Sequence, residues 1–482
     1  MRDSRRKWLW LILTASVLVR VAVAFYLGDI VDAPSLLTDQ RSYHALGVRL
    51  LEGKGYSFGE GWYPFTPPDT PTAHWSFLYP LFVAAVYAVF GVHPLAARAV
   101  QAVLGGLLLP WMVYRLARTV FGHPLPRASL APTASHRRTD GGGHLVPLVA
   151  AALTAGYGYF VLHSATLMTE TFYIVALLWS LDEALKLDTR LRNERDVPFT
   201  LLLRLGFSLG LAALLRQSIL PWVPVLFLWL LWQAWRSRRF QEAAQSLTLV
   251  GLILAVCILP WTYRNYRVYG QFLLLNSNTG YAMYSAQHPM HGTNFREFDA
   301  APLPEHLWGL PEPELDRLLM RQGIRFVLEE PGRYALLSLS RLRAFFEFWP
   351  TPDTSLLHNV GRTGSFGLFL PFMVYGLYLS SCRPGSTIAT PHAVDGRGMS
   401  GVVLLYLFMG FYTLLHVLTW AMVRYRLPVD AVLLPFAALA VTETCGRIYR
   451  RIARWINQGA QSPMPESVEA AKKKAEEVGS GS

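Results

Sequence analysis

Apolar stretches long enough to cross a membrane recur along this chain of 482 residues. A membrane-spanning helix needs about 20 mostly apolar residues. By that criterion the pattern predicts about ten spans, at residues 8–27, 95–114, 146–162, 166–181, 199–215, 219–235, 247–261, 366–381, 401–420 and 427–444. We therefore expect an all-α integral membrane protein.

The composition agrees with this pattern. Hydrophobic residues make up 52% of the chain and charged residues only 16%, whereas a soluble domain carries about 25% charged residues. The formal net charge of +12 could suggest a nucleic-acid partner. However, the arginines lie in short clusters between the apolar runs, which is what membrane topology produces. We expect no nucleic-acid binding.

These basic clusters predict the orientation of the protein. Cytoplasmic loops carry an excess of Lys and Arg, and with ten spans the clusters all fall on the side of the N-terminus, within residues 115–138, 186–195, 236–239, 383–397 and 447–454. Both termini are therefore predicted to be cytoplasmic, in a plasma (inner) membrane. The apolar segment 77–90 is short, opens with Tyr79-Pro80 and ends at Gly91. It is predicted to be a helix on the outer surface, because an extra span would invert every later loop.

This layout divides the chain into two parts. Residues 1–450 form a transmembrane catalytic unit with two outer regions, 29–93 and 264–365, each predicted to contain juxtamembrane helices. Residues 451–482 form a basic amphipathic and disordered cytoplasmic tail, whose last four residues, Gly-Ser-Gly-Ser, resemble a cloning scar.

Charged residues at the outer ends of spans are the candidates for chemistry, because charge is costly there. Asp39 opens a helix after the first span and is either a helix cap or a general base. Glu170 either stabilises a helix N-terminus or acts in the site. Arg216 lies in a short outer turn against the charge rule, which favours an anionic partner. Arg264 leaves a span on the outside, where it binds either an anion or lipid headgroups.

The order and spacing of several short motifs resemble the GT-C superfamily of membrane glycosyltransferases. The resemblance is nearest to the branch of protein O-mannosyltransferases and lipid A aminoarabinose transferases, and it runs almost from end to end. The motifs are Asp39-x-x-x-Tyr43, Gly53-Lys54-Gly55-Tyr56, Pro71-Thr72-Ala73, Leu78-Tyr79-Pro80-Leu81-Phe82, Thr169-Glu170, Pro260-Trp261, Arg264-Asn265-Tyr266 and Arg424-Tyr425-Arg426-Leu427-Pro428.

The resemblance implies the GT-C fold and an inverting transfer of a monosaccharide from a polyprenyl-phosphate carrier to an acceptor, at an extracytoplasmic site. Asp39 stands at the position of the family's catalytic residue and would take the acceptor's proton, with Glu170 and His74 as further catalytic candidates. The candidates for binding the donor phosphate are Arg216, Arg264, Arg41 and Arg424. The candidates for the substrate pocket are Tyr43, Tyr79 and Asn265.

One stretch departs from the family pattern. Relatives often carry Glu-Lys-Pro-Pro before the outer surface helix, and residues 74–77 here read His-Trp-Ser-Phe. His74 either binds metal or only forms hydrogen bonds, so a divalent metal stays open as a cofactor and no other is expected. The expected partners are the polyprenyl-phosphate sugar and membrane lipids. A lipid or glycan acceptor is favoured over a protein, since no soluble acceptor domain is evident.

Two other classes of protein fit parts of the pattern. A secondary transporter or flippase of a lipid-linked or anionic substrate would show internal repeats and broken helices at the bilayer midplane, and no repeat is visible. An O-antigen-ligase-like enzyme also has a large outer loop. The Asp39-x-x-x-Tyr43 motif directly after the first span argues against it.

Overall fold

The computed structural model describes residues 2–31, 39–62, 64–122, 145–193, 195–296, 299–352, 356–381 and 397–460. Within these ranges every regular element is a helix, apart from two isolated β-bridges. The α-helices are α1 (Arg2–Leu27), α2 (Asp39–Leu51), α3 (Leu78–Phe90), α4 (Pro94–Phe121), α5 (Val146–Ala155), α6 (Gly158–Ala165), α7 (Glu170–Arg192), α8 (Phe199–Leu215), α9 (Trp222–Arg236), α10 (Phe240–Tyr269), α11 (Thr279–Gln287), α12 (Glu312–Glu329), α13 (Pro331–Phe345), α14 (Leu356–Arg362), α15 (Leu368–Ser381), α16 (Arg397–Leu418) and α17 (Leu427–Ala460). The predicted all-α fold is confirmed.

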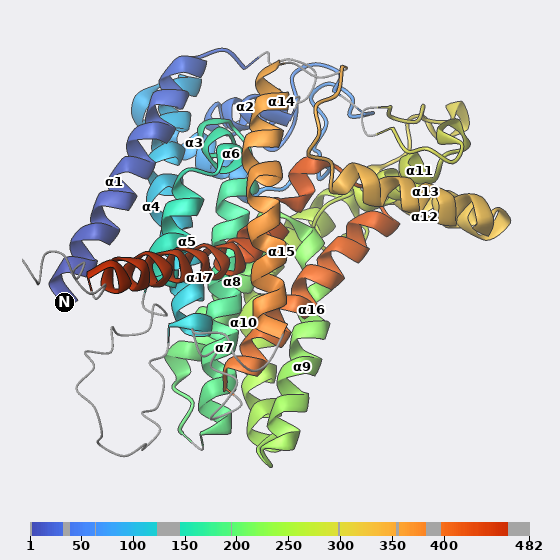
Figure 1. Cartoon of the computed structure of the whole chain (residues 1–482). Helices are drawn as coiled ribbons and strands as arrows, with labels where there is room; N and C mark the ends of the chain where they lie inside the picture. The colour runs from blue at the N-terminus through green and yellow to red at the C-terminus, as the bar shows by residue number, and fades with distance from the viewer. Residues whose placement is uncertain are drawn as a thin grey trace, which may run out of the picture.

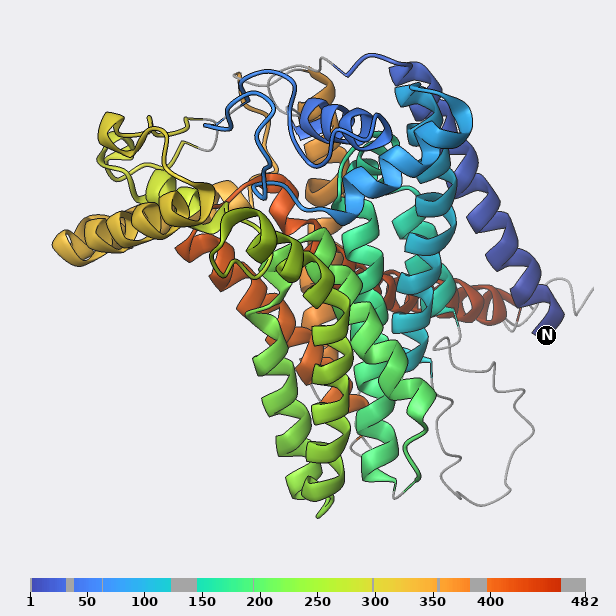
Figure 2. The same cartoon turned by 180° about the vertical axis from the view of Figure 1, so that it is seen from behind.

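The long helices form a bundle, and α2, α3 and α6 lie together at one end of it, which we call the α2 end (Figures 1 and 2). Among the described residues, seven helices are long and apolar enough to cross a membrane, or eight if the bent pair α5–α6 is one span. This confirms a multi-pass membrane protein. The predicted count of ten spans is not confirmed.

Two predicted spans fall short of that criterion for identifiable reasons. The segment predicted at 166–181 becomes α7, which begins only at Glu170 and continues into a charged region that contains Asp182, Glu183 and Lys186. Helix α8 is apolar but has only 17 residues.

The predicted span 146–162 is broken into α5 and α6, which meet at 55°. A break leaves backbone carbonyls without helical partners, which is costly in an apolar surrounding. Arg20, fully buried on α1, donates to the carbonyls of Ala155 (3.0 Å) and Thr154 (3.2 Å). One buried guanidinium therefore stabilises the break.

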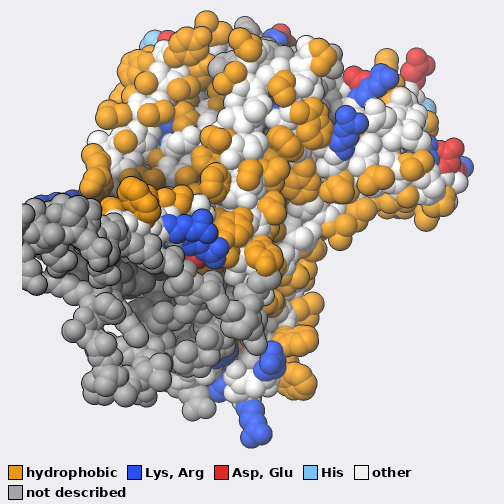
Figure 3. Space-filling view, viewed as in Figure 1, with side chains coloured by type: hydrophobic (Ala, Val, Ile, Leu, Met, Phe, Trp, Pro, Cys, Tyr) orange, Lys and Arg blue, Asp and Glu red, His pale blue; other side chains and the backbone are white. Residues whose placement is uncertain are grey.

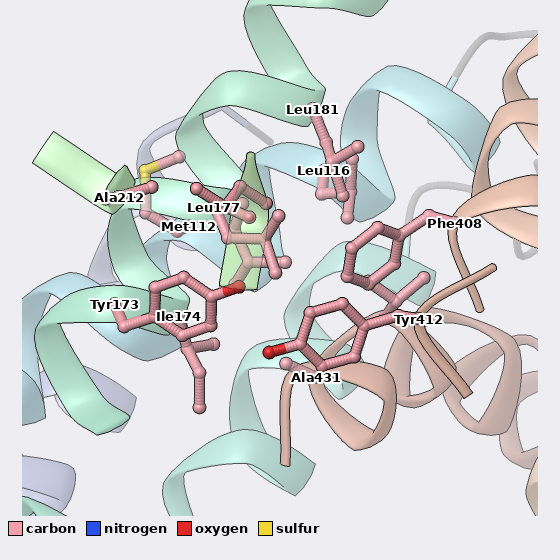
Figure 4. Packing of buried hydrophobic residues seen from close by; sticks show 14 of the residues in the cluster. Met112, Leu116, Tyr173, Ile174, Leu177, Leu181, Ala212, Phe408, Tyr412 and Ala431 are labelled. Atoms are coloured by element: carbon pink, nitrogen blue, oxygen red, sulfur yellow. The ribbon is translucent and has the colours of Figure 1, made fainter. Parts of the chain in front are cut away.

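The core of the bundle is formed where α4, α7 and α16 meet. Met112 and Leu116 on α4, Ile174 on α7 and Phe408 on α16 converge in Figure 4. Glycines allow still closer packing elsewhere. A Cβ at Gly376 on α15 would lie 1.9 Å from a backbone oxygen of α17.

The predicted short helix at 77–90 is confirmed as α3, whose 13 residues are too few to cross a bilayer. It packs on α2 so closely that a Cβ at Gly47 would lie 2.6 Å from Val83. Helices α11, α12 and α13 form an arm that projects sideways from the bundle (Figure 1). On α13 the side chains of Leu336 and Leu339 are exposed, whereas Arg341 is buried and donates to Gln287 of α11 at 2.8 Å.

Helix α17 unites two elements that were predicted separately, the last span at 427–444 and the start of the basic tail. Its far end crosses the bundle beside the N-terminus of α1 (Figures 1 and 2). Residues 461–482 lie outside the described ranges. Hydrophobic side chains cover much of the flank of the bundle, and Lys and Arg gather at the end opposite α2 (Figure 3).

Candidate active site

The site is built around Asp39, the first residue of α2. An acidic side chain in the first turn is favoured by the helix dipole. The preceding residues 32–38, including the alternative cap Thr38, lie outside the described residues. Asp39 accepts a hydrogen bond from Arg424, whose Nη1 lies 2.6 Å from Asp39 Oδ2, and each side chain is 15% exposed. This ion pair joins positions that are 385 residues apart in the sequence.

Arg424 reaches Asp39 because the chain turns between α16 and α17. The turn is the short 3-10 helix η7, Val423–Arg426. The last residue of this turn, Arg426, is fully buried and forms an ion pair with Asp430 at 3.0 Å, which holds the turn against the start of α17. A tight turn between two spans thus presents Arg424 to the start of α2.

A second ion pair lies beside the first. Glu170 opens α7, is almost fully buried, and accepts a hydrogen bond from Arg216 Nη2 at 2.5 Å. Arg216 also donates from Nε to Thr169 Oγ1 at 2.9 Å. It leaves the end of α8 in an extended conformation, so its side chain points back to the start of α7. Two contacts therefore hold this guanidinium.

The two ion pairs form one cluster. Arg424 Nε lies 4.0 Å from Glu170 Oε1, the oxygen that Arg216 binds. The ring of Tyr425 lies 5.1 Å from the guanidinium of Arg216 and 5.3 Å from that of Arg424. We call this group the charge cluster; its members are Asp39, Glu170, Arg216 and Arg424. The charge cluster is formally neutral.

Tyr43 and Tyr79 form an aromatic wall beside the charge cluster. Tyr43 lies one turn after Asp39 on α2, is buried, and packs edge-on against Tyr79 at 4.9 Å and Trp75 at 5.7 Å. Burial raises the pKa of Tyr43, and the carboxylate of Asp39 raises it further. Tyr43 is therefore a neutral hydroxyl in this site at neutral pH.

Buried polar side chains that the sequence analysis did not single out position this wall and Glu170. The amide of Gln101 on α4 accepts from the Tyr79 hydroxyl at 2.6 Å and donates to the Thr166 carbonyl at 2.6 Å. Gln40, next to Asp39, accepts from the Leu167 backbone NH at 3.0 Å. The linker before α7 is thereby tied to both α2 and α4. A polar Gln101 inside a predicted apolar span was the available signal.

Comparison with family models and with curated proteins finds no match for this chain. Solved structures do match. The archaeal oligosaccharyltransferase AglB from Archaeoglobus fulgidus, in complex with an inhibitory peptide and a dolichol-phosphate, superposes with a TM-score of 0.56 at 15% identity, covering 98% of this chain and 54% of that chain. The apo form of the Archaeoglobus fulgidus oligosaccharyltransferase gives a TM-score of 0.53 at 17% identity, covering 93% and 52%. The chain has the GT-C fold.

This confirms the predicted fold, and at such low identity the likeness is one of fold alone. The chain spans about half the length of the archaeal enzyme. ArnT from Cupriavidus metallidurans, bound to undecaprenyl phosphate, also matches at 13% identity, covering 90% of this chain and 78% of that chain. Its TM-score of 0.39 is too low to bear on the site.

Within the GT-C fold, other predicted site residues lie apart from the charge cluster. Arg264 donates to the backbone carbonyls of Thr72 (2.9 Å) and Tyr56 (3.4 Å) and stacks on Trp261. The neighbouring Asn265 is buried and donates to the Leu275 carbonyl at 2.8 Å. Both side chains therefore connect α10 to backbone segments around it.

Arg41 also points away from Asp39. Its side chain is 58% exposed, forms an ion pair with Glu60 at 3.1 Å, and lies over the ring of Trp62. It borders an open cavity of about 570 Å³ on the other side of α2, together with His44 and Arg49.

His74 is buried among aromatic rings, 5.3 Å from Trp75, 5.7 Å from Phe65 and 6.4 Å from Tyr281. Burial lowers the pKa of His74, against the opposing effects of Glu312 and Asp39. Its ring is therefore neutral at neutral pH. Nδ1 of His74 has no hydrogen-bond partner among the described residues.

Glu312, on α12, is a buried carboxylate that the sequence analysis missed. Its Oε2 accepts from the Ala73 backbone NH and from the Ser277 hydroxyl, both at 2.7 Å. It thereby fixes the arm to the stretch that carries His74. Among the described residues, no group of three or more His, Cys, Asp or Glu side chains could hold a metal ion.

Proposed function

We propose that this protein is an inverting glycosyltransferase, which moves a monosaccharide from a polyprenyl-phosphate carrier to an acceptor hydroxyl on the extracytoplasmic face of the plasma (inner) membrane. The observation that carries the proposal is the charge cluster. Two arginines and two carboxylates meet at the α2 end of the bundle.

The cluster has the groups that such a transfer requires. A polyprenyl phosphate brings an anionic head at the end of an apolar chain, and it would approach from the lipid. Arginine binds phosphate oxygens with two parallel hydrogen bonds. Arg216 and Arg424 both lie close to the ring of Tyr425 and both approach Oε1 of Glu170, so both can contact one phosphate. Asp39 lies within hydrogen-bond distance of Arg424 and therefore near that phosphate.

The reaction proposed here is a single displacement. The acceptor oxygen forms a bond to the anomeric carbon as the bond from that carbon to the phosphate oxygen breaks, and the electron pair leaves on the phosphate. The acceptor's proton passes to Asp39 as the general base. Arg216 and Arg424 stabilise the charge that develops on the leaving phosphate.

The fold supports the choice of donor. The archaeal oligosaccharyltransferase of the same fold was solved with a dolichol-phosphate, which is itself a polyprenyl-type phosphate. For the acceptor, a lipid or glycan is preferred to a protein. The arm presents exposed leucines such as Leu336 and Leu339, which suits a site beside a lipid surface.

A transporter is the competing class, and the broken pair α5–α6 is the feature that favours it. Transporters use the free backbone groups at such breaks to coordinate ions. Here the side chain of Arg20 occupies the carbonyls of Thr154 and Ala155. A cation would have to displace a buried arginine, so this break favours a structural role.

The test uses undecaprenyl phosphate, the carrier that an undecaprenyl-phosphate sugar releases on transfer, with undecaprenol as the comparison. We expect binding by purified protein to depend on the phosphate. Arg216→Ala should weaken that binding by about 10- to 100-fold, the scale of hydrogen bonds to a charged group. Arg216→Lys should weaken it less, because a point charge replaces part of the fork.

Arg267→Ala is the matched control, since Arg267 is exposed and bonds only the Tyr263 hydroxyl among the contacts described. A thermal melt of each variant separates lost binding from lost folding. Equal affinity of wild type and Arg216→Ala would leave Arg216 with only its structural contacts to Glu170 and Thr169. Equal affinity for undecaprenol and undecaprenyl phosphate would remove the phosphate site and the proposed function with it.

A further inference from the structure

The two arginines of the charge cluster are held in different ways. Arg216 has a carboxylate at 2.5 Å, the Thr169 hydroxyl at 2.9 Å and the ring of Tyr425 against its face. Arg424 has one close hydrogen bond, to Asp39, and its Nε is buried without a hydrogen-bond partner among the described residues. Arg216 is therefore anchored, whereas Arg424 has bonding capacity left over.

The partner of Arg424 is the proposed base itself. The hydrogen bond from Arg424 Nη1 at 2.6 Å occupies Oδ2 of Asp39 and holds this carboxylate toward η7. Asp39 in this arrangement is therefore restrained by Arg424. The reaction needs the opposite arrangement, with Asp39 released to the acceptor hydroxyl and Arg424 on the phosphate.

We propose that Arg424 is a positioning residue that couples donor binding to the release of Asp39. The arriving phosphodiester takes hydrogen bonds from Arg424 and leaves Asp39 unpaired, next to the acceptor. The inference rests on the proposed function. It implies that the donor binds before the acceptor is activated, so that the base is not available in the empty site.

The movement of charge during transfer fits this role. In the donor complex, Asp39 carries one negative charge and the phosphodiester carries another. After transfer Asp39 holds the acceptor's proton and is neutral, and the released polyprenyl phosphate has gained the negative charge. Arg424 then stays with the phosphate. When the product leaves, Asp39 gives its proton to water and pairs with Arg424 again.

Both carboxylates of the charge cluster lie close to Arg424, which favours this exchange. Arg424 already lies 2.6 Å from Asp39 and 4.0 Å from Glu170. A phosphate held by the anchored Arg216 would lie within reach of a side-chain rotation of Arg424, because both guanidinium groups approach the same oxygen of Glu170. No backbone rearrangement of η7 is required.

The coupling makes a specific prediction, that Asp39 competes with the phosphate for Arg424. Asp39→Asn should therefore tighten the binding of undecaprenyl phosphate, by about tenfold, the middle of the range for side chains in direct contact. The same substitution in an Arg424→Gln background should have little effect. A double-mutant cycle with wild type, both single variants and the double variant measures the difference.

Two further variants keep the cycle informative. Arg424→Lys retains a charge and should retain part of the coupling, which a purely structural role of Arg424 would not predict. If the melt shows that Arg424→Gln does not fold, Arg424→Lys takes its place in the cycle. The matched control is the pair Asp69→Asn and Arg49→Gln. Asp69 and Arg49 also form an ion pair, at 2.5 Å, in which Asp69 is 69% exposed. These substitutions should leave the affinity for undecaprenyl phosphate unchanged.

The results separate this inference from the proposed function. Additive effects of Asp39→Asn and Arg424→Gln, with binding that still depends on Arg216, would refute the coupling and leave the proposed function in place. Weaker or unchanged binding by Asp39→Asn would refute it as well. Absence of any phosphate-dependent binding by wild type would overturn both.

Discussion

Replacing Asp39 with Asn is the most direct test of the catalytic role. Asn is nearly the same shape, and its side-chain oxygen can still accept the hydrogen bond that Arg424 donates at 2.6 Å. What it loses is the negative charge and with it the ability to take a proton. We expect turnover to fall by about 10²-fold or more, which is the scale of general-base catalysis.

The effect of this substitution on stability should be small, and the structure gives its size. A hydrogen bond to a charged group contributes about 1.5–3 kcal/mol and a neutral one about 0.5–1.5 kcal/mol. The asparagine side chain would still accept from the charged guanidinium, so Asp39→Asn loses only the ion-pair part of this contact, about 1 kcal/mol. Asp39→Ala would also lose the remaining hydrogen bond and the favourable charge at the start of α2, a further loss of about 1 kcal/mol.

The assay needs purified variants, one thermal melt each, and a transfer reaction with the matched donor, which mass spectrometry of the copurifying lipid would identify. Asp69→Asn is the control. Asp69 has an arginine partner like Asp39, but it is 69% exposed, and its positive φ of 55° is one that Asn also tolerates. This control should melt and turn over like wild type.

If Asp39→Asn turns over at the wild-type rate, Asp39 acts only as a helix cap at the start of α2. The base would then have to be Glu170 or His74. A loss of turnover together with a large loss of stability, or an equal loss in Asp69→Asn, would also contradict the reasoning, because the charge would then act on folding and not on proton transfer.

Three other predictions concern the frame of the site. Cysteine labelling of intact cells from outside should reach positions 39 and 278 and not position 137, and labelling at 137 would contradict the predicted orientation. Arg20→Met should destabilise the protein by about 1–3 kcal/mol for each buried carbonyl left without a donor, seen as a lower melting temperature. An unchanged melt would mean that the α5–α6 break does not need Arg20. Burial raises the pKa of Asp316 from 3.8 to about 6, although the backbone NH groups of Gly280 and Tyr281 oppose the shift. A carboxyl that holds its proton more tightly in the folded state contributes stability at low pH and loses it as pH rises. The free energy of unfolding of the arm should therefore fall by up to about 3 kcal/mol between pH 4 and 6. Asp316→Asn should abolish this pH dependence of the melting temperature.

The frame of this protein could be predicted from the sequence because membrane helices are determined by local composition. An apolar run of about 20 residues satisfies its own backbone in lipid whatever its neighbours are. The all-α class, the short surface helix α3 and the position of Asp39 at the start of a helix all follow from such local rules. The break between α5 and α6 did not, because it depends on Arg20, more than a hundred positions away in the chain.

The charge cluster is the part that only the tertiary structure decides. Asp39, Glu170, Arg216 and Arg424 were all candidates, but nothing local indicates which arginine faces which carboxylate. The charge rule singled out Arg216 as out of place, and the structure supplies Glu170 as its partner. Arg264 was a candidate because it leaves a span on the outside, but its donors meet backbone carbonyls of a segment almost 200 residues earlier. Long arginine side chains select partners by distance in space, so the sequence determines which residues can act and the packing of the helices determines which of them meet.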